Sequence, residues 1–256
     1  MPSTHGRFVW YELMTTDPVA ARAFYSHVVG WTAADAQMPG MDYWMFNAGE
    51  SAVAGVTELP EEARQMSAPP SWIGYIGVES VDAAAASVTA NGGTVHVPPR
   101  DVPTVGRFAI VADPRGAVVA LFKFANPELD LPAEQEKPGH VGWHELHAGD
   151  ATTDFDFYAK LFGWVKKDAM DMGEMGIYQM FGKDDVMLGG MMTKPPTMPV
   201  AAWSYYFNVG NIDEAAERVK AGGGQIAFGP DQVPGGKFIL MGFDPQGAGF
   251  ALLGSR

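Results

Sequence analysis

Residues 8–13, FVWYEL, and residues 141–146, VGWHEL, both place a tryptophan two positions before a Glu-Leu pair. The turn sequence DPRG at residues 113–116 likewise returns as DPQG at residues 244–247. Other matched landmarks are AFY at 23–25 with DFY at 156–158, GW at 30–31 with GW at 163–164, Tyr43 with Tyr178, and Trp72 with Trp203. The offset stays near about 131 to 135 residues, which is domain-sized and much longer than a solenoid repeat. The chain therefore carries two copies of one fold.

Composition places the chain among globular proteins. Its 256 residues suffice for two compact domains, and its shares of 47% hydrophobic and 18% charged residues are typical of folded chains. With no cysteine, disulfides, thiolate nucleophiles and Cys-based zinc sites are excluded. Residues 1–6 lack the pattern of a signal peptide, and no apolar run reaches the roughly 20 residues of a membrane span. We expect a cytoplasmic protein with no membrane partner.

The charge balance argues against one class of partner and leaves another open. A net charge of −13 repels the phosphate backbone, so we expect no nucleic-acid partner. The same charge helps attract a cationic ligand, or it only keeps the protein soluble. Both interpretations stay open.

Each copy is predicted to contain two β-α-β-β-β units. In the first unit, residues 8–14 are predicted to form a strand, and Asp17 then caps a helix that has Pro18 at its first position and ends at Gly30. Short strands follow around Trp31, at 43–48 and at 52–57. The second unit has predicted strands at 72–78, 94–97, 108–112 and 117–124, and a helix capped by Ser80.

The second copy repeats this order at about residues 140–193 and 202–253, with helices through 155–162 and 213–221. Residues 126–138 contain three prolines and predict a linker. The expected domains are therefore residues 1–125 and 139–256, joined by 126–138.

These paired units resemble the vicinal oxygen chelate superfamily, which includes glyoxalase I, bleomycin-resistance proteins and extradiol dioxygenases. The resemblance is carried by the first strand ending before Asp17, the helix from AFY to VGW at residues 23–31, the VDAA helix start at 81–84, and the Asp-Pro-x-Gly turns. It implies an α+β fold of two tandem glyoxalase-like domains, each made of two βαβββ units. It also implies a monomer that imitates the dimer of single-copy relatives, as in the tandem glyoxalase-related subgroup.

The resemblance permits a test for the family's metal centre. Metal-dependent members place a His or Glu on the first strand, a Glu on the last strand, and a further ligand on the first strand of the second unit. The matching positions here hold Trp10 and Trp143, Ala120 and Ala251, and Ile73 and Ser204. A divalent metal needs at least three converging N or O donors. We therefore expect no metal and no other cofactor.

Because side chains alternate along a strand, the sequence indicates which residues line the cavity that holds the metal in metal-dependent members. If Trp10 occupies the family's inward position, Glu12 faces the same cavity, as do Trp143, Glu145 and His147 in the second copy. An aromatic wall beside a carboxylate suits a planar or cationic small molecule. Further wall candidates are Tyr43, Tyr178, Trp72 and Trp203.

Other roles fit some of these residues. A repeated tryptophan also suits a core, and a buried glutamate could pair with an arginine such as Arg22 or Arg107. Glu145 and His147 could share a metal ion, but Met14 stands at the position equivalent to His147, so symmetry does not support such a site.

The favoured hypothesis is a metal-free glyoxalase-like protein that binds a small apolar or aromatic molecule, including a cationic one, in pockets between βαβββ units. Whether it is an enzyme stays open. One alternative is a lyase or isomerase with Glu12 or Glu145 as general base, whose pKa apolar neighbours would bring near neutrality. Another is an interaction protein whose pockets are vestigial.

Overall fold

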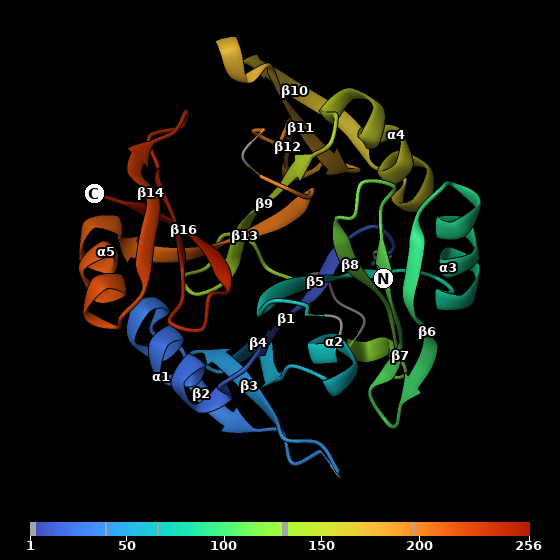
Figure 1. The fold of residues 1–256 in the computed structure, drawn as a ribbon, viewed down its shortest axis with the longest axis horizontal. Helices are drawn as coiled ribbons and strands as arrows, with labels where there is room; N and C mark the ends of the chain where they lie inside the picture. Colours follow the sequence, from blue (N-terminus) through green and yellow to red (C-terminus); the bar gives the residue numbers. More distant parts are fainter. Residues whose placement is uncertain (1–3, 39, 66, 130–132, 197) are drawn as a thin grey trace. The chain divides into compact units, whose positions relative to one another are not determined.

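The computed structural model describes residues 4–38, 40–65, 67–129, 133–196 and 198–256. Within these residues the β-α-β-β-β order occurs four times, as the sequence predicted (Figure 1). Part of the predicted linker, residues 130–132, lies outside the described residues.

The first copy contains eight strands among its described residues. Its first unit comprises β1 (Phe8–Thr15), α1 (Pro18–Val29), β2 (Thr32–Asp35), β3 (Tyr43–Ala48) and β4 (Ser51–Glu58). A short helix, α2 (Glu61–Gln65), follows in a stretch for which no helix was predicted. The second unit comprises β5 (Ser71–Gly77), α3 (Val81–Ala90), β6 (Thr94–Val102), β7 (Gly106–Ala112) and β8 (Val118–Phe124).

The second copy follows a 3-10 turn, η1 (Pro127–Leu129), in the predicted linker. Its first unit comprises β9 (Val141–Ala148), α4 (Ala151–Phe162), β10 (Val165–Asp171), η2 (Gly173–Met175), β11 (Ile177–Lys183) and β12 (Val186–Thr193). Its second unit comprises β13 (Ala202–Asn211), α5 (Ile212–Ala221), β14 (Gln225–Gln232), β15 (Phe238–Phe243) and β16 (Gly249–Ser255).

The described strands form two eight-stranded sheets, one per copy. The strand orders are β2-β3-β4-β1-β5-β8-β7-β6 and β10-β11-β12-β9-β13-β16-β15-β14. In each unit the first strand pairs in parallel with the last, as β1 does with β4 and β9 with β12. This is the expected α+β fold. Among the described residues, no helix has the length and apolar character that crossing a bilayer requires.

Local sequence explains where the helices begin and end. Asp17 accepts a hydrogen bond from the Ala20 amide at 2.9 Å, and Pro18 occupies the first turn of α1. Gly30 ends α1 in the left-handed conformation, with φ of 89°, which glycine adopts without steric cost. The same cap pattern recurs in α4, where Asp150 accepts from the amides of Thr152 and Thr153.

The chain divides into two compact units that cut across the two copies. The first unit draws its described residues from Met1–Val9, Gly74–Ala133 and His144–Trp203. The second draws them from Trp10–Ile73, Glu134–Trp143 and Ser204–Arg256. Each compact unit thus combines half of one copy with half of the other, and each is described separately below.

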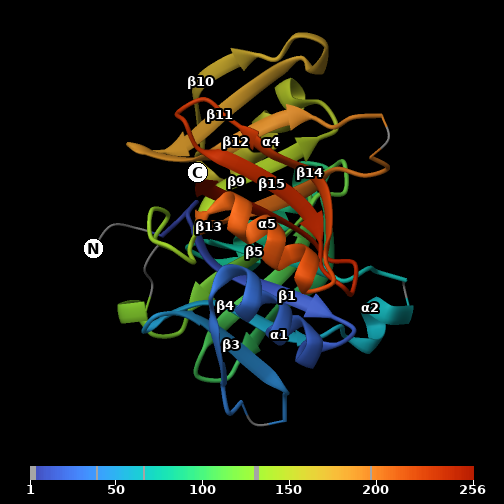
Figure 2. The same cartoon turned by 90° about the vertical axis from the view of Figure 1, so that its left-hand side faces the viewer.

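In the second compact unit, α1 of the first copy packs beside α5 of the second (Figures 1 and 2). Phe24 meets Phe250 with ring centroids 5.5 Å apart, and Arg218 donates to the Val28 carbonyl at 3.1 Å. The Trp31 indole donates to the Gly139 carbonyl at 2.8 Å. The core around these contacts is aromatic and includes Tyr25, Trp31, Phe46, Trp72 and Phe207.

A buried hydrogen-bonded chain joins the two copies in this unit. The Trp72 indole donates to the Tyr25 hydroxyl at 2.8 Å, and that hydroxyl donates to Asp244 Oδ2 at 3.1 Å. Asp244 Oδ1 accepts from the amides of Gln246 and Ala248, which shapes the predicted Asp-Pro-x-Gly turn. The repeated Tyr, Trp and Asp landmarks are therefore parts of one contact between copies.

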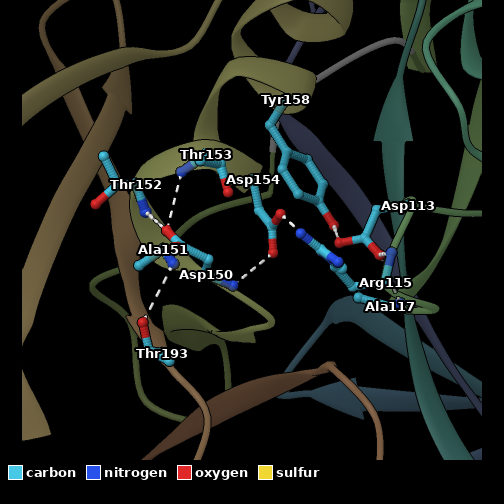
Figure 3. A network of polar contacts seen from close by, with 10 residues as sticks. All are labelled: Asp113, Arg115, Ala117, Asp150, Ala151, Thr152, Thr153, Asp154, Tyr158 and Thr193. Carbon is cyan, nitrogen blue, oxygen red and sulfur yellow. Dashed lines mark hydrogen bonds and ion pairs between the residues drawn. The ribbon is translucent and has the colours of Figure 1, made fainter.

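The first compact unit contains the counterpart of this chain. The Trp203 indole donates to the Tyr158 hydroxyl at 3.3 Å, which donates to Asp113 Oδ2 at 2.9 Å. Figure 3 shows Tyr158 pointing at Asp113, and Arg115 from the same turn pointing at Asp154 of α4, 3.3 Å away. Here the turn belongs to the first copy and the helix to the second.

Candidate functional site

The first candidate site lies on β1, in the second compact unit. Trp10, Glu12 and Met14 are half-buried, whereas the residues between them, Tyr11 and Leu13, are buried. This alternation places the three half-buried side chains on one face of the strand. The sequence predicted that Trp10 and Glu12 share a face, and the burial pattern agrees.

Tyr43 connects the other two site residues on this face. Its hydroxyl accepts a hydrogen bond from the Trp10 indole at 2.9 Å and donates one to the Glu12 carboxylate. The order of donation is fixed, because an indole N–H only donates and a carboxylate only accepts. Trp10, Tyr43 and Glu12 thus form one polar chain on a half-buried surface.

A glycine makes room for this chain. Gly55 on β4 is the register partner of Glu12, and a Cβ atom on Gly55 would collide with the Tyr43 ring and hydroxyl. The tyrosine can therefore cross β4 toward Glu12 only because residue 55 has no side chain. Gly55 was not among the predicted site residues, although the repeat contains a signal for it. Gly55 and Gly190 are separated by the same interval as Tyr43 and Tyr178.

Electrostatics keep the tyrosine protonated. Burial raises the pKa of Tyr43 well above its usual value, and the negative charge of Glu12 raises it further. The hydroxyl therefore remains a donor to Glu12 at every physiological pH. The hydrogen bond from Tyr43 therefore helps to orient the Glu12 carboxylate.

The second copy builds the same frame on β9. Glu145 and His147 alternate with Leu146 and lie on one face, and Gly190 on β12 is the register partner of Glu145. A Cβ atom on Gly190 would collide with the Tyr178 ring, as at Gly55. Trp143, half-buried, precedes Glu145 on the same face of the strand.

The two copies differ in the residue that follows the glutamate on the same face of the strand. Glu145, with 7% of its surface exposed, lies 3.2 Å from His147, measured from Oε2 to Nε2. The equivalent of His147 in the first copy is Met14, which forms no such pair. The second copy therefore holds a carboxylate–imidazole pair that the first copy lacks.

His144 points away from this face, as alternation predicted. It is fully buried, its ring stacks on Phe8 with centroids 3.9 Å apart, and its Nδ1 lies 2.6 Å from the Leu188 carbonyl. Burial lowers the pKa of His144 to about 4. The residue is a neutral part of the core of the first compact unit.

The structure places the two other predicted wall tryptophans in the cores. Trp72 and Trp203 are 8% and 9% exposed, and they donate their indole N–H groups to Tyr25 and Tyr158. They lie on the face of their strands that packs against aromatic core residues. Their part in the structure is the contact between copies described above.

The arginines considered as partners for the glutamates bind elsewhere. Arg22 lies over the Trp44 ring, 3.5 Å from its centroid, and Arg107 pairs with Asp82 and Asp101.

The family's metal does not fit the residues present. Trp10 gives its N–H to Tyr43 and offers no lone pair, and Ala120, Ala251 and Ile73 are buried apolar side chains. In the ranges that the structure describes, no group of three His, Cys, Asp or Glu residues could hold a metal ion. Glu145 and His147 supply two donors where a protein metal site needs at least three.

Comparisons with known proteins agree with this fold. The family described as Glyoxalase/Bleomycin resistance protein/Dioxygenase superfamily matches residues 7–121 and 137–252. "Putative glyoxylase CFP32" of Mycobacterium tuberculosis (strain CDC 1551 / Oshkosh) is 33% identical over 247 residues, covering 95% of this chain and 93% of that protein. "Anthracycline biosynthesis protein DauV" of Streptomyces sp. (strain C5) is 29% identical over 264 residues, covering 98% and 94%.

Solved structures show the same architecture at low identity. The Mn(II)-bound glyoxalase from Novosphingobium aromaticivorans superposes with a TM-score of 0.66 at 18% identity, covering 99% of this chain and 83% of that one. The 2,3-dioxygenase LapB from Pseudomonas sp. KL28 gives a TM-score of 0.65 at 11% identity, covering 97% and 92%. The chain belongs to the glyoxalase/bleomycin resistance protein/dioxygenase superfamily and carries its domain in two tandem copies.

Proposed function

We propose that this protein binds a small apolar or aromatic molecule, including a cationic one, on the faces that carry Glu12 and Glu145, without the family's usual metal. The observation that carries the proposal is the chain from Trp10 through Tyr43 to Glu12, with Gly55 making room for it. The Glu-Gly-Tyr frame recurs at Glu145 in the second copy.

The chemistry of these faces favours such a ligand. An indole and a phenol beside a carboxylate attract a flat cation through the ring faces and through charge. Half-buried Met45 and Met180 lie opposite Gly55 and Gly190 on the neighbouring strands, and methionine adapts to irregular aromatic surfaces. The net charge of −13 also favours a cationic ligand.

The name of one relative is compatible with an aromatic ligand. DauV, which the chain matches over 98% of its length, is named for anthracycline biosynthesis. Anthracyclines are polycyclic aromatic compounds. A flat aromatic ligand for this chain is consistent with that likeness.

Ligand-dependent thermal unfolding tests the proposal. The probes are 1-naphthylmethylamine, a cation at neutral pH, and 2-naphthol. We expect both to raise the unfolding midpoint of the wild type with a chelator present, and Trp10→Leu and Glu12→Gln to reduce the rise. Glu62→Gln, on the exposed helix α2, is the matched control. No rise with any probe would favour the alternative of an interaction protein with vestigial pockets.

A second candidate function is a metal-free lyase or isomerase, favoured by the Glu145–His147 pair. In such an enzyme the Glu145 carboxylate would take a proton from a carbon beside a carbonyl, the electrons of the broken C–H bond would form an enolate, and the enolate carbon would later regain a proton from the glutamic acid. Exchange of the methyl protons of acetophenone into D₂O, followed by ¹H NMR with chelator present, tests this function. Loss of catalysed exchange in Glu145→Gln would support it, and no exchange above the buffer rate would exclude it for this probe.

We further propose that the protein acts in the cytoplasm as a monomer. Each compact unit already combines elements of both copies, so one chain supplies the partner that a single-copy relative takes from a second subunit. Light scattering at micromolar concentration should give the mass of one chain, and an obligate larger assembly would contradict this.

A further inference from the structure

The two imidazole nitrogens of His147 have different surroundings. Its Nε2 lies 3.2 Å from Glu145 Oε2, and its side chain is 12% exposed. Its Nδ1 is buried, and none of the described residues provides a hydrogen-bond partner for it. A buried polar atom without a partner is rare in folded proteins and calls for a water or a ligand.

The position of Glu145 favours one tautomer of the neutral ring. Its Oε2 lies 3.2 Å from Nε2, and because a carboxylate only accepts, the neutral imidazole is favoured with its proton on Nε2. In that neutral ring Nδ1 keeps a lone pair and acts as an acceptor. A group that approaches Nδ1 must therefore bring its own hydrogen.

Besides Glu145, two methionines lie in the row of residues that contains His147 on this face. Met192 on β12 is its register partner, and Met170 on β10 is the register partner of Tyr178. Both methionines are half-buried. Thioethers and an aromatic ring suit the flat body of an aromatic molecule.

We propose that His147 Nδ1 accepts a hydrogen bond from the ligand of the second copy, which selects flat aromatic molecules that carry a hydroxyl or N–H group. This inference rests on the function proposed above. The first copy has Met14 at the equivalent position, opposite Thr57, and so lacks this acceptor. The two copies would then differ in the ligands they prefer.

Two matched probes test the proposal. 2-Naphthol carries the hydroxyl donor, and 2-methoxynaphthalene has the same rings without it. In protein labelled with ¹⁵N-histidine, long-range ¹H–¹⁵N spectra should show His147 protonated on Nε2. 2-Naphthol should shift its Nδ1 resonance, and 2-methoxynaphthalene should not. A proton on Nδ1 in the free protein, or the same response to both probes, would overturn the inference.

Affinity supplies a second, independent readout. Met192 labelled with ¹³C at its methyl group reports binding to the second copy alone. The wild type should bind 2-naphthol about five- to tenfold more tightly than 2-methoxynaphthalene, as expected for one net hydrogen bond. His147→Met, which installs the residue of the first copy, should remove this preference. His96→Met, the same change at an exposed position, should keep it.

The outcomes separate this inference from the proposed function. If both probes bind equally well, or if His147→Met keeps the preference, aromatic binding stands and the role of His147 falls. If neither probe binds the wild type at millimolar concentration, the proposed function fails and this inference fails with it. If His147→Met does not fold, the ¹⁵N spectra of the wild type still decide the matter.

Discussion

Replacing Tyr25 with phenylalanine should test the contact between copies in the second compact unit. The substitution keeps the ring in its aromatic core and removes only the hydroxyl, which accepts from Trp72 and donates to Asp244. Tyr25 is 0% exposed and Asp244 4% exposed, so water replaces the lost partner poorly. A neutral hydrogen bond contributes about 1 kcal/mol and one to a charged group about 2 kcal/mol. The free energy of unfolding should therefore fall by about 2 to 4 kcal/mol.

The loss should depend on pH in a defined direction. Burial raises the pKa of Asp244, and the Tyr25 hydrogen bond lowers it, so the substitution raises it further. A carboxyl with a raised pKa in the folded state contributes stability at low pH, which is lost as pH rises through that pKa. The variant should therefore be most destabilised near neutral pH, and the difference from wild type should shrink toward about pH 4.

Tyr43→Phe provides a matched control within the same unit. Tyr43 also links an indole N–H to a carboxylate, but the residue is half-buried, whereas Tyr25 is fully buried. Urea unfolding of both variants at neutral and acid pH measures the difference, and Tyr43→Phe should cost less than about 1 kcal/mol. Equal losses in the two variants, or a loss from Tyr25→Phe that does not change with pH, would show that the buried bond from Tyr25 to Asp244 is not the source of the loss.

Three further predictions concern other parts of the structure. His144→Phe should make the free energy of unfolding less dependent on pH below about 6.5. In the wild type this free energy should fall by up to about 3 kcal/mol between about pH 6.5 and pH 4, because His144 gains a proton in that range only when the protein unfolds. The same pH dependence in urea unfolding of both proteins would contradict this. Gly55→Ala and Gly190→Ala should each displace a tyrosine and weaken the binding of 2-naphthol about tenfold or more, as measured by calorimetry. Gly210→Ala, at an exposed position with open space around it, should leave this affinity unchanged. Protein purified without chelator should carry no stoichiometric divalent ion by elemental analysis, and about one tightly bound metal per copy would overturn the metal-free account.

The repeats and local signals predicted most of the fold. The caps at Asp17 and Ser80, the stop at Gly30 and the strand at Tyr43–Ala48 follow from residue chemistry that acts within a few positions. Period-two alternation correctly placed Trp10 with Glu12 and turned His144 the other way. These features depend on neighbours along the chain.

Features that depend on distant parts of the chain could not be predicted in this way. The bonds from Tyr25 to Asp244 and from Tyr158 to Asp113 join different copies, and a repeat within the sequence does not reveal which copy a side chain will meet. Trp72 and Trp203 were named as further candidates for the wall of a pocket. Alternation alone does not say which face of a strand the core aromatics will cover.

Metal-free binding at the two glutamates is tested by calorimetric titration of 1-naphthylmethylamine with excess chelator, comparing the wild type with the Glu12→Gln/Glu145→Gln double variant. We expect saturable binding by the wild type that the chelator leaves unchanged, and binding at least about tenfold weaker in the double variant because both oriented carboxylates lose their charge. Binding that disappears with chelator and returns with Mn²⁺ would show that a metal holds the ligand, and equal affinity in the two proteins would show that the glutamates do not.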